Sequence, residues 1–300
     1  MKFILRWSLF IKERFNPIAN TATILMFFAA NALYYIVCLS KSKAEFPWVL
    51  GFILVWLVFF HMRLFDDIKD YETDKVYNKE RPLPRGLVSI KEYGFVTFFC
   101  IALEIIIASS LGPAVFTAYV FVLCFTLLMR QEFFIGEWLR HKMELYAVSH
   151  TLSSFLIGIL VYSLTGNNLY QVPVLAVLFS LGNWFVFNVF EFGRKTFSKD
   201  EERIGVDSYS SRLKPWGAFL LISVNILGAL FCLLLPSAKV MDTDNFKYLI
   251  VSEMALTFIV MLSGVLYCIK NSKGFAGFYR SVISAYLLLH YVLLVFIMVL

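Results

Sequence analysis

Long apolar runs recur along the whole chain, and they limit the fold more than any other feature. Each run has roughly 18–25 residues, and a helix needs about 20 to cross the roughly 30 Å hydrocarbon core of a bilayer. Lipid offers the backbone no hydrogen bonds, so a spanning segment must satisfy its own polar groups, as a helix does. The sequence therefore predicts an all-α polytopic membrane protein with about nine transmembrane helices. The predicted spans lie at about 17–39, 46–64, 93–111, 113–130, 145–165, 171–191, 215–236, 246–269 and 279–300.

Composition agrees with this interpretation. Hydrophobic residues make up 60% of the 300 residues and charged residues only 16%. A soluble domain of this size needs more polar cover than that. No linker or low-complexity stretch interrupts the chain, so we expect a single domain over residues 1–300. The 32 Phe residues suit either lipid contact or the lining of an apolar cavity, and composition does not separate the two.

The basic residues predict the orientation. Of the 27 Lys and Arg residues, 23 lie before the first predicted span or in the connections after the second, fourth, sixth and eighth. The first of these groups is Lys2, Arg6, Lys12 and Arg14, and the opposite side holds only Lys41, Lys43, Lys239 and Lys247. Cytoplasmic loops carry the excess of positive charge. We therefore expect the N-terminus and both acidic loops to be cytoplasmic and the C-terminus to lie on the opposite side. The net charge of +6 follows this topology and does not indicate a nucleic-acid partner.

The loop after the second span carries a stripe of carboxylates. On a helix, the spacing of Asp66, Asp67, Asp70 and Asp74 puts these side chains on one face. Like charges repel there, and a divalent cation such as Mg²⁺, which prefers carboxylate oxygen, would relieve the repulsion. Basic residues follow and could neutralise a phosphate; they are Lys75, Lys79, Arg81 and Arg85. From spacing alone, a solvated helix at the membrane surface is an equally good interpretation.

The combined pattern resembles a known family. D66-D67-x-x-D70-x-x-x-D74 followed by R81-P82-L83-P84-R85-G86 is similar to the first signature of the UbiA superfamily of intramembrane prenyltransferases, which also follows the second of nine helices. Asp66 stands where that family commonly has Asn. The resemblance implies helices bundled around a central apolar cavity, Mg²⁺ as the cofactor, and an isoprenyl diphosphate and a lipophilic acceptor as partners. It assigns Asp67, Asp70 and Asp74 to catalysis and all four aspartates to metal binding.

The loop after the sixth span occupies the place of the family's second acidic motif, with a looser match. The resemblance aligns Glu191 with the first acid and Asp200 or Glu201, which precede Gly205, with the second. These three residues are the expected second metal-binding set. Arg194 and Lys195 are interpreted either as diphosphate contacts or as anchors at the membrane surface.

Two further basic residues resemble family positions that face the diphosphate. Arg14 precedes Asn16-Pro17-Ile18 at the start of the first span, and Arg130 closes the fourth span. Together with Lys75, Arg81, Arg194 and Lys195, they form the expected diphosphate-binding set. A simple anchoring role at the positively charged side is an equal alternative for Arg14.

Polar residues inside the apolar runs need separate consideration. Intramembrane carboxylates are costly, so Glu104 should face the bundle or be protonated. Glu253 is expected near the outer edge and solvated. His61, His150 and His290 are expected to be structural, because a lone histidine on an apolar helix usually is.

The sequence therefore predicts a prenyltransferase that uses Mg²⁺ to move a prenyl group from an isoprenyl diphosphate to a lipophilic acceptor, aromatic acceptors included. An intramembrane terpene cyclase of the same superfamily is the alternative, because ionisation of the diphosphate is common to both. A transporter gated by charged loops is a third hypothesis, and it predicts polar residues along the spans, which are nearly free of them.

Overall fold

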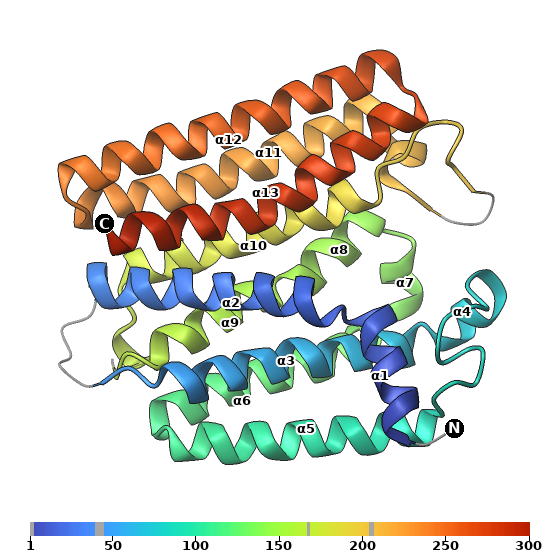
Figure 1. Cartoon of the computed structure of the whole chain (residues 1–300), viewed down its shortest axis with the longest axis horizontal. Coiled ribbons are helices and arrows are strands. Elements are labelled where there is room, and N and C mark those ends of the chain that lie inside the picture. The colour runs from blue at the N-terminus through green and yellow to red at the C-terminus, as the bar shows by residue number, and fades with distance from the viewer. Residues whose placement is uncertain (1–2, 40–44, 167–168, 204–206) are drawn as a thin grey trace.

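Helices account for nearly all of the regular structure. The computed structural model describes residues 3–39, 45–166, 169–203 and 207–300, so the predictions that involve Lys2, Lys41, Lys43 and Gly205 lie outside the described residues. Within those ranges there is no strand (Figure 1). In chain order the elements are α1 (Phe3–Arg14), α2 (Pro17–Tyr34), the π-helical turn η1 (Tyr35–Leu39), α3 (Trp48–Lys69), α4 (Tyr71–Tyr77), α5 (Ile90–Ser110), α6 (Pro113–Arg130), η2 (Glu132–Phe134), α7 (Gly136–Arg140), α8 (Met143–Thr151), α9 (Ser153–Ser163), η3 (Leu169–Gln171), α10 (Val174–Arg194), α11 (Tyr209–Val240), α12 (Thr243–Lys270) and α13 (Lys273–Val299).

The predicted spans are confirmed. In the described part of the chain, nine helical segments are long and apolar enough to cross a membrane, α2 with η1 and α8 with α9 each counting as one. Local capping moves two boundaries outward from the predicted ones. Ser89 and Glu92 form a capping box, so α5 begins at Ile90 instead of residue 93. Ser208 caps α11 in the same way, so that helix begins at Tyr209, although it kinks at Lys214 before Pro215.

The bundle has two sides joined by central helices (Figure 1). Helices α10 to α13 pack together on one side, while α3, α5 and α6 form the other, and α2 and α9 contact both groups. Close approach of α10 to α13 depends on Gly193, since a Cβ there would lie 2.5 Å from two side-chain atoms of Ile283. This contact fixes the end of α10, from which the second acidic loop leaves.

Aromatic and amide side chains fill the middle of the bundle. Tyr34 stacks on Phe179 with ring centroids 3.7 Å apart. Asn183 donates to Asn31 at 2.8 Å and accepts a hydrogen bond from Tyr291 at 3.0 Å. These contacts link α2, α10 and α13 and satisfy polar groups that lipid cannot satisfy.

Two features differ from the sequence-based expectations. Glu253 is fully buried and lies 3.0 Å from Nδ1 of His290, so the expectation of a solvated side chain is wrong. The reason is that α12 begins at Thr243, so Glu253 lies about three helical turns inside the start of that helix. The amphipathic helix α1 has no counterpart among the predicted spans; its Trp7 and Phe10 pack against Tyr93, and its last residue is Arg14.

Candidate functional site

Both acidic loops lie at the same end of the bundle, and the first of them lies beside α1 (Figure 1). We call this the charged end and define it as residues 66–89, 194–203 and 207–209. The C-terminus lies at the opposite end (Figure 1). Arg194, at the end of α10, is within electrostatic reach of Asp66 and Arg63 at the end of α3. The two segments predicted to act together are therefore close in space.

The four aspartates of the first loop divide into two pairs with different surroundings. Asp66 is 45% exposed at its side chain and has only Lys69 beside it, at 3.3 Å. Asp70 makes no side-chain hydrogen bond to any described residue. Burial, together with the charges of Asp66 and Asp74, raises the pKa of Asp70 above its ordinary value, while Lys69 opposes the shift. Asp66 and Asp70 thus retain oxygen atoms for a cation.

Asp67 is bound to arginines. Its side chain is 4% exposed, and Arg14 donates to Oδ1 at 2.6 Å. Arg63, one turn earlier on α3, forms a second ion pair with the same oxygen. Tyr93 donates to Oδ2 at 3.3 Å. Asp67 therefore joins α1, α3 and α5 at the charged end.

Asp74 is bound to the loop that follows it. Nη1 of Arg81 lies 2.6 Å from both carboxylate oxygens, and Asn78 donates at 2.8 Å. Lys75 does not join these groups; it is exposed, pairs with Glu72 at 3.0 Å and lies over the ring of Tyr71. A narrow opening between Asp67 and Asp74, too small for a water molecule, is lined also by Arg14 and Arg81.

The acids of the second loop are paired as well. Glu191 accepts from Arg194 at 2.5 Å and lies 3.0 Å from Nζ of Lys195. Glu201 forms an ion pair with Arg280 of α13 at 2.6 Å. The hydrogen bonds from Arg280 and Ser198 lower the pKa of Glu201 to about 2. Asp200 is exposed and has no hydrogen-bond partner among the described residues.

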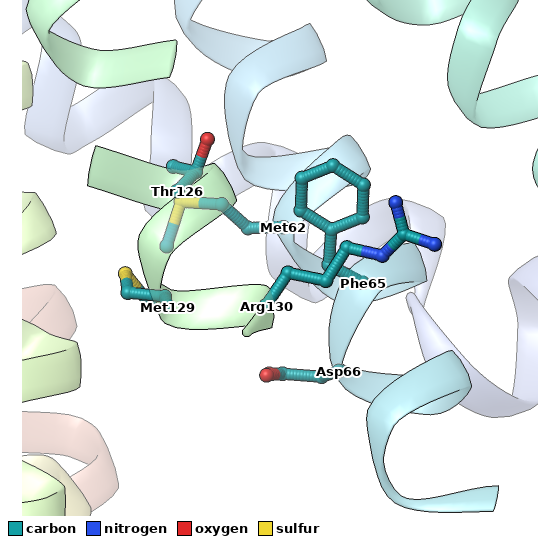
Figure 2. A pocket seen from close by; sticks show the side chains of 6 residues that line it. All are labelled: Met62, Phe65, Asp66, Thr126, Met129 and Arg130. Carbon is teal, nitrogen blue, oxygen red and sulfur yellow. The ribbon is translucent and has the colours of Figure 1, made fainter. Parts of the chain in front are cut away.

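Arg130 lies at a second opening, with room for about one water molecule, between α3 and α6 (Figure 2). Its lining residues are Met62, Phe65, Asp66, Thr126, Met129 and Arg130. The Arg130 guanidinium lies over the ring of Phe65, 5.1 Å from its centroid, and has no carboxylate partner among the described residues. We call this opening the α3–α6 crevice. It places a free cation next to Asp66.

Sequence reasoning missed Arg63 and Arg280. Arg63 is one turn before Asp67, so the i,i+4 spacing on a helix was a usable signal. Arg280 is 79 residues from its partner, and no local pattern connects the two. Both arginines offset acids that the sequence assigned to metal binding.

The donor set fits a magnesium ion shared with substrate. Within the described residues, no three His, Cys, Asp or Glu side chains gather closely enough to hold a metal ion by themselves. Mg²⁺ usually takes one or two carboxylates and completes its shell with water and phosphate oxygens. Asp66 and Asp70 supply such carboxylates, and Arg194 and Arg130 lie where a diphosphate would need positive charge.

The model of the UbiA prenyltransferase family matches residues 23–299. No curated protein sequence matches the chain.

Three solved structures share the fold. A digeranylgeranylglyceryl phosphate synthase is 17% identical, with a TM-score of 0.60 over 98% of each chain. A UbiA homologue from Aeropyrum pernix K1 is 15% identical, with a TM-score of 0.63 over 91% of this chain and 94% of the other. A UbiA homologue from Archaeoglobus fulgidus, bound to GPP and Mg²⁺, is 12% identical, with a TM-score of 0.54 over 92% and 96%.

Proposed function

The chain belongs to the UbiA prenyltransferase family, and we propose that it transfers a prenyl group from an isoprenyl diphosphate to a lipophilic acceptor inside the membrane, with Mg²⁺ as cofactor. The observation that carries this proposal is the composition of the charged end. Asp66 and Asp70 form no ion pair with an arginine of the described chain, and Arg130, which has no carboxylate partner there, lines the same opening as Asp66. The neighbour of similar fold that is bound to GPP and Mg²⁺ supports the same pair of ligands.

Asp66 and Asp70 would hold the metal. In the second loop, Asp200 is the acid that has no hydrogen-bond partner among the described residues. When bound, Mg²⁺ offsets negative charge on the departing diphosphate. Arg130 and Arg194 would bind the diphosphate oxygens and stabilise the same charge. Four acids that the sequence assigned to metal binding would instead each hold an arginine in place. The pairs are Asp67 with Arg14, Asp74 with Arg81, Glu191 with Arg194 and Glu201 with Arg280.

The membrane interior supplies the second requirement of the reaction. Breaking the allylic C–O bond leaves a carbocation that reacts readily with water. Apolar and aromatic side chains exclude water and stabilise positive charge by cation–π contact, each contact worth roughly 0.5–2 kcal/mol. The openings described above have room for about one water molecule at most, so the central cavity predicted from the sequence stays a prediction. A prenyl chain would have to displace side chains of the bundle to enter.

The test is incubation of the purified protein with Mg²⁺ and isoprenyl diphosphates of several chain lengths, with and without a lipid extract. Mass spectrometry then identifies new lipids. Transfer predicts prenylated products only when the extract is present. Cyclic products from the donor alone would instead support the terpene cyclase. Release of no diphosphate under any condition would contradict both enzymatic functions.

A further inference from the structure

A buried polar cluster joins α3, α5 and α6 deeper in the membrane than the charged end. His61, Glu104 and Tyr119 have no exposed surface, and Thr126 has 1%. Nδ1 of His61 lies 2.8 and 2.9 Å from the two carboxylate oxygens of Glu104. Tyr119 donates to Glu104 at 3.0 Å. Such groups are costly in a membrane, and a function is the default explanation for them.

The order of the groups is that of a base-activated hydroxyl. Nε2 of His61 lies 3.1 Å from Oγ1 of Thr126. A carboxylate that holds an imidazole, which in turn contacts a hydroxyl, is the arrangement that makes a hydroxyl transfer its proton. Glu104 and Tyr119 orient the ring through Nδ1, which leaves Nε2 to accept from Thr126. The Thr126 hydroxyl has a second acceptor, the carbonyl of Leu123 at 2.9 Å, so its hydrogen has two alternative positions.

The cluster ends at the α3–α6 crevice. Thr126 lines that crevice together with Asp66 and Arg130 (Figure 2). The ring of Phe65 contacts both sides, with the His61 ring 5.2 Å away and the Arg130 guanidinium 5.1 Å away. His61 precedes Asp66 by five residues, a rise of about 8 Å along a helix. The hydroxyl therefore lies between the proposed metal carboxylate and a buried acid–histidine pair.

We propose that Thr126, His61 and Glu104 form a proton relay that deprotonates a hydroxyl group of the acceptor; this inference rests on the proposed prenyl transfer. The C–O bond of the donor breaks, and its electron pair leaves with the diphosphate. The acceptor oxygen forms the new bond to the prenyl carbon. Its proton passes to Oγ1 of Thr126 as the Thr126 proton passes to Nε2 of His61, and Glu104 balances the charge on the imidazolium. Thr126 contacts the acceptor, while His61 and Glu104 act through it.

The other side of the bundle supplies a matched control. Glu253 and His290 form a second buried acid–histidine pair, and Thr257 follows one turn after Glu253. Neither of the openings described above is lined by these residues. Glu253→Gln and Thr257→Val therefore make the same side-chain changes as Glu104→Gln and Thr126→Val, but at positions away from the crevice.

The first experiment measures proton exchange and needs no substrate. The chain has only 4 His residues, so ¹⁵N-histidine labelling in lipid nanodiscs gives at most four ring systems, which single substitutions assign. We expect the His61 ring N–H to exchange with water faster than that of His290. Thr126→Val should slow the His61 exchange, and Thr126→Ser should restore it. Exchange at His61 that is as slow as at His290, or is unchanged by Thr126→Val, would overturn the relay.

The second experiment separates donor ionisation from acceptor alkylation. The probes are geranyl diphosphate with Mg²⁺ and a lipid extract of the expression host, and both diphosphate and prenylated lipid are measured. Thr126→Val and Glu104→Gln should lower lipid prenylation about 10²-fold, the lower range for general base catalysis, and retain diphosphate release as water captures the cation. Thr126→Ser should recover prenylation, and the two control variants should match wild type.

The outcomes distinguish the two proposals. If Thr126→Val prenylates lipid as fast as wild type, the relay is refuted, but the proposed prenyl transfer is not. The relay would also be refuted if Thr126→Val lost diphosphate release and prenylation equally while Thr257→Val lost neither. The Thr126 hydroxyl would then act in the ionisation of the donor and not in the deprotonation of the acceptor. Absence of diphosphate release in wild type would contradict the proposed function, and the exchange rates alone would then decide the relay.

Discussion

At the scale of single residues, the partners of each acid determine its role. Asp67 and Asp66 are neighbours in sequence, but Asp67 is buried against Arg14 and Arg63, whereas Asp66 faces an opening. The spacing predicted both on one acidic stripe, and the family resemblance assigned both to metal binding. Spacing could not separate them, because Arg14 lies 53 residues before Asp67, on a helix, α1, that was not among the predicted spans.

Asp67→Asn should destabilise the protein. The substitution leaves Arg14 and Arg63 without their shared negative charge, and breaking such a buried pair costs about 3 kcal/mol. Thermal unfolding in detergent measures the effect, and Asp66→Asn is the control that should unfold close to the wild-type temperature. Equal unfolding temperatures for wild type and Asp67→Asn would show that Asp67 does not hold the charged end together.

Asp70→Asn should have the opposite effect in the absence of metal. Burial and like charges raise the pKa of Asp70 in the folded protein above its ordinary 3.8. The folded state then binds the proton more tightly than the unfolded state, so stability falls as pH rises through the interval between the two pKa values. At neutral pH the ionised carboxylate therefore lowers the stability of the folded state.

Removing that charge should raise the unfolding temperature of the metal-free protein and abolish the stabilisation that Mg²⁺ with diphosphate gives to wild type by mass action. Both midpoints are measured in one thermal titration. A lower unfolding temperature for metal-free Asp70→Asn would contradict the repulsion argument.

At the scale of elements, hydropathy was sufficient to predict where the spans lie, but it could not predict which contacts hold the loops. The bilayer fixes the length of a spanning helix, so apolar runs located all nine within a few residues. The second loop is held by contacts that no period predicts. Glu201 binds Arg280, and Tyr267 donates to the carbonyl of Phe197 at 2.8 Å. These partners come from α12 and α13, far along the chain, so the sequence could name the acids of this loop but not their surroundings.

Arg280→Gln should release the second loop from α13. The Arg280 hydrogen bond depresses the pKa of Glu201 to about 2, so the stability of this contact is fully present above the ordinary value of 4.5 and is lost as pH falls through about 2. At neutral pH, trypsin should cut Arg280→Gln after Lys199 and Arg203 several-fold faster than wild type. Pepsin should attack the wild-type loop increasingly across the same acidic range. Arg280→Lys keeps the charge and should give an intermediate rate, whereas identical rates in all three proteins would exclude docking by this ion pair.

At the scale of the whole molecule, the charge distribution and the fold agree. The loops that carry most of the basic residues lie at the charged end, and the C-terminus lies at the other end (Figure 1). By the positive-inside rule, we expect the charged end to face the cytoplasm. A diphosphate donor is water-soluble at its head and apolar in its tail, so a site at the membrane surface above an apolar bundle suits it.

Single cysteines test this orientation. In a Cys124→Ala background, Lys199→Cys should react with a membrane-impermeant maleimide only from the cytoplasmic side, and Lys247→Cys only from the opposite side. Labelling is read in sealed vesicles of the two orientations. Reaction of both positions from the same side would contradict the nine-span topology.

The central claim is that acidic residues at the charged end promote metal-dependent loss of diphosphate from a prenyl donor. Asp66→Ala tests it most directly, because Ala removes the oxygen ligand that Asn, the residue common in the family at this position, would keep. Asp66 lies at the crevice and forms no ion pair with an arginine of the described chain, so its loss should leave the fold intact. The measurement is Mg²⁺-dependent diphosphate release from geranyl diphosphate by wild type and Asp66→Ala, each confirmed to be folded by its unfolding temperature. We predict release by wild type and a loss of about 10²-fold or more in Asp66→Ala, the scale of one charge-stabilising group. Equal rates in two equally stable proteins would contradict the claim.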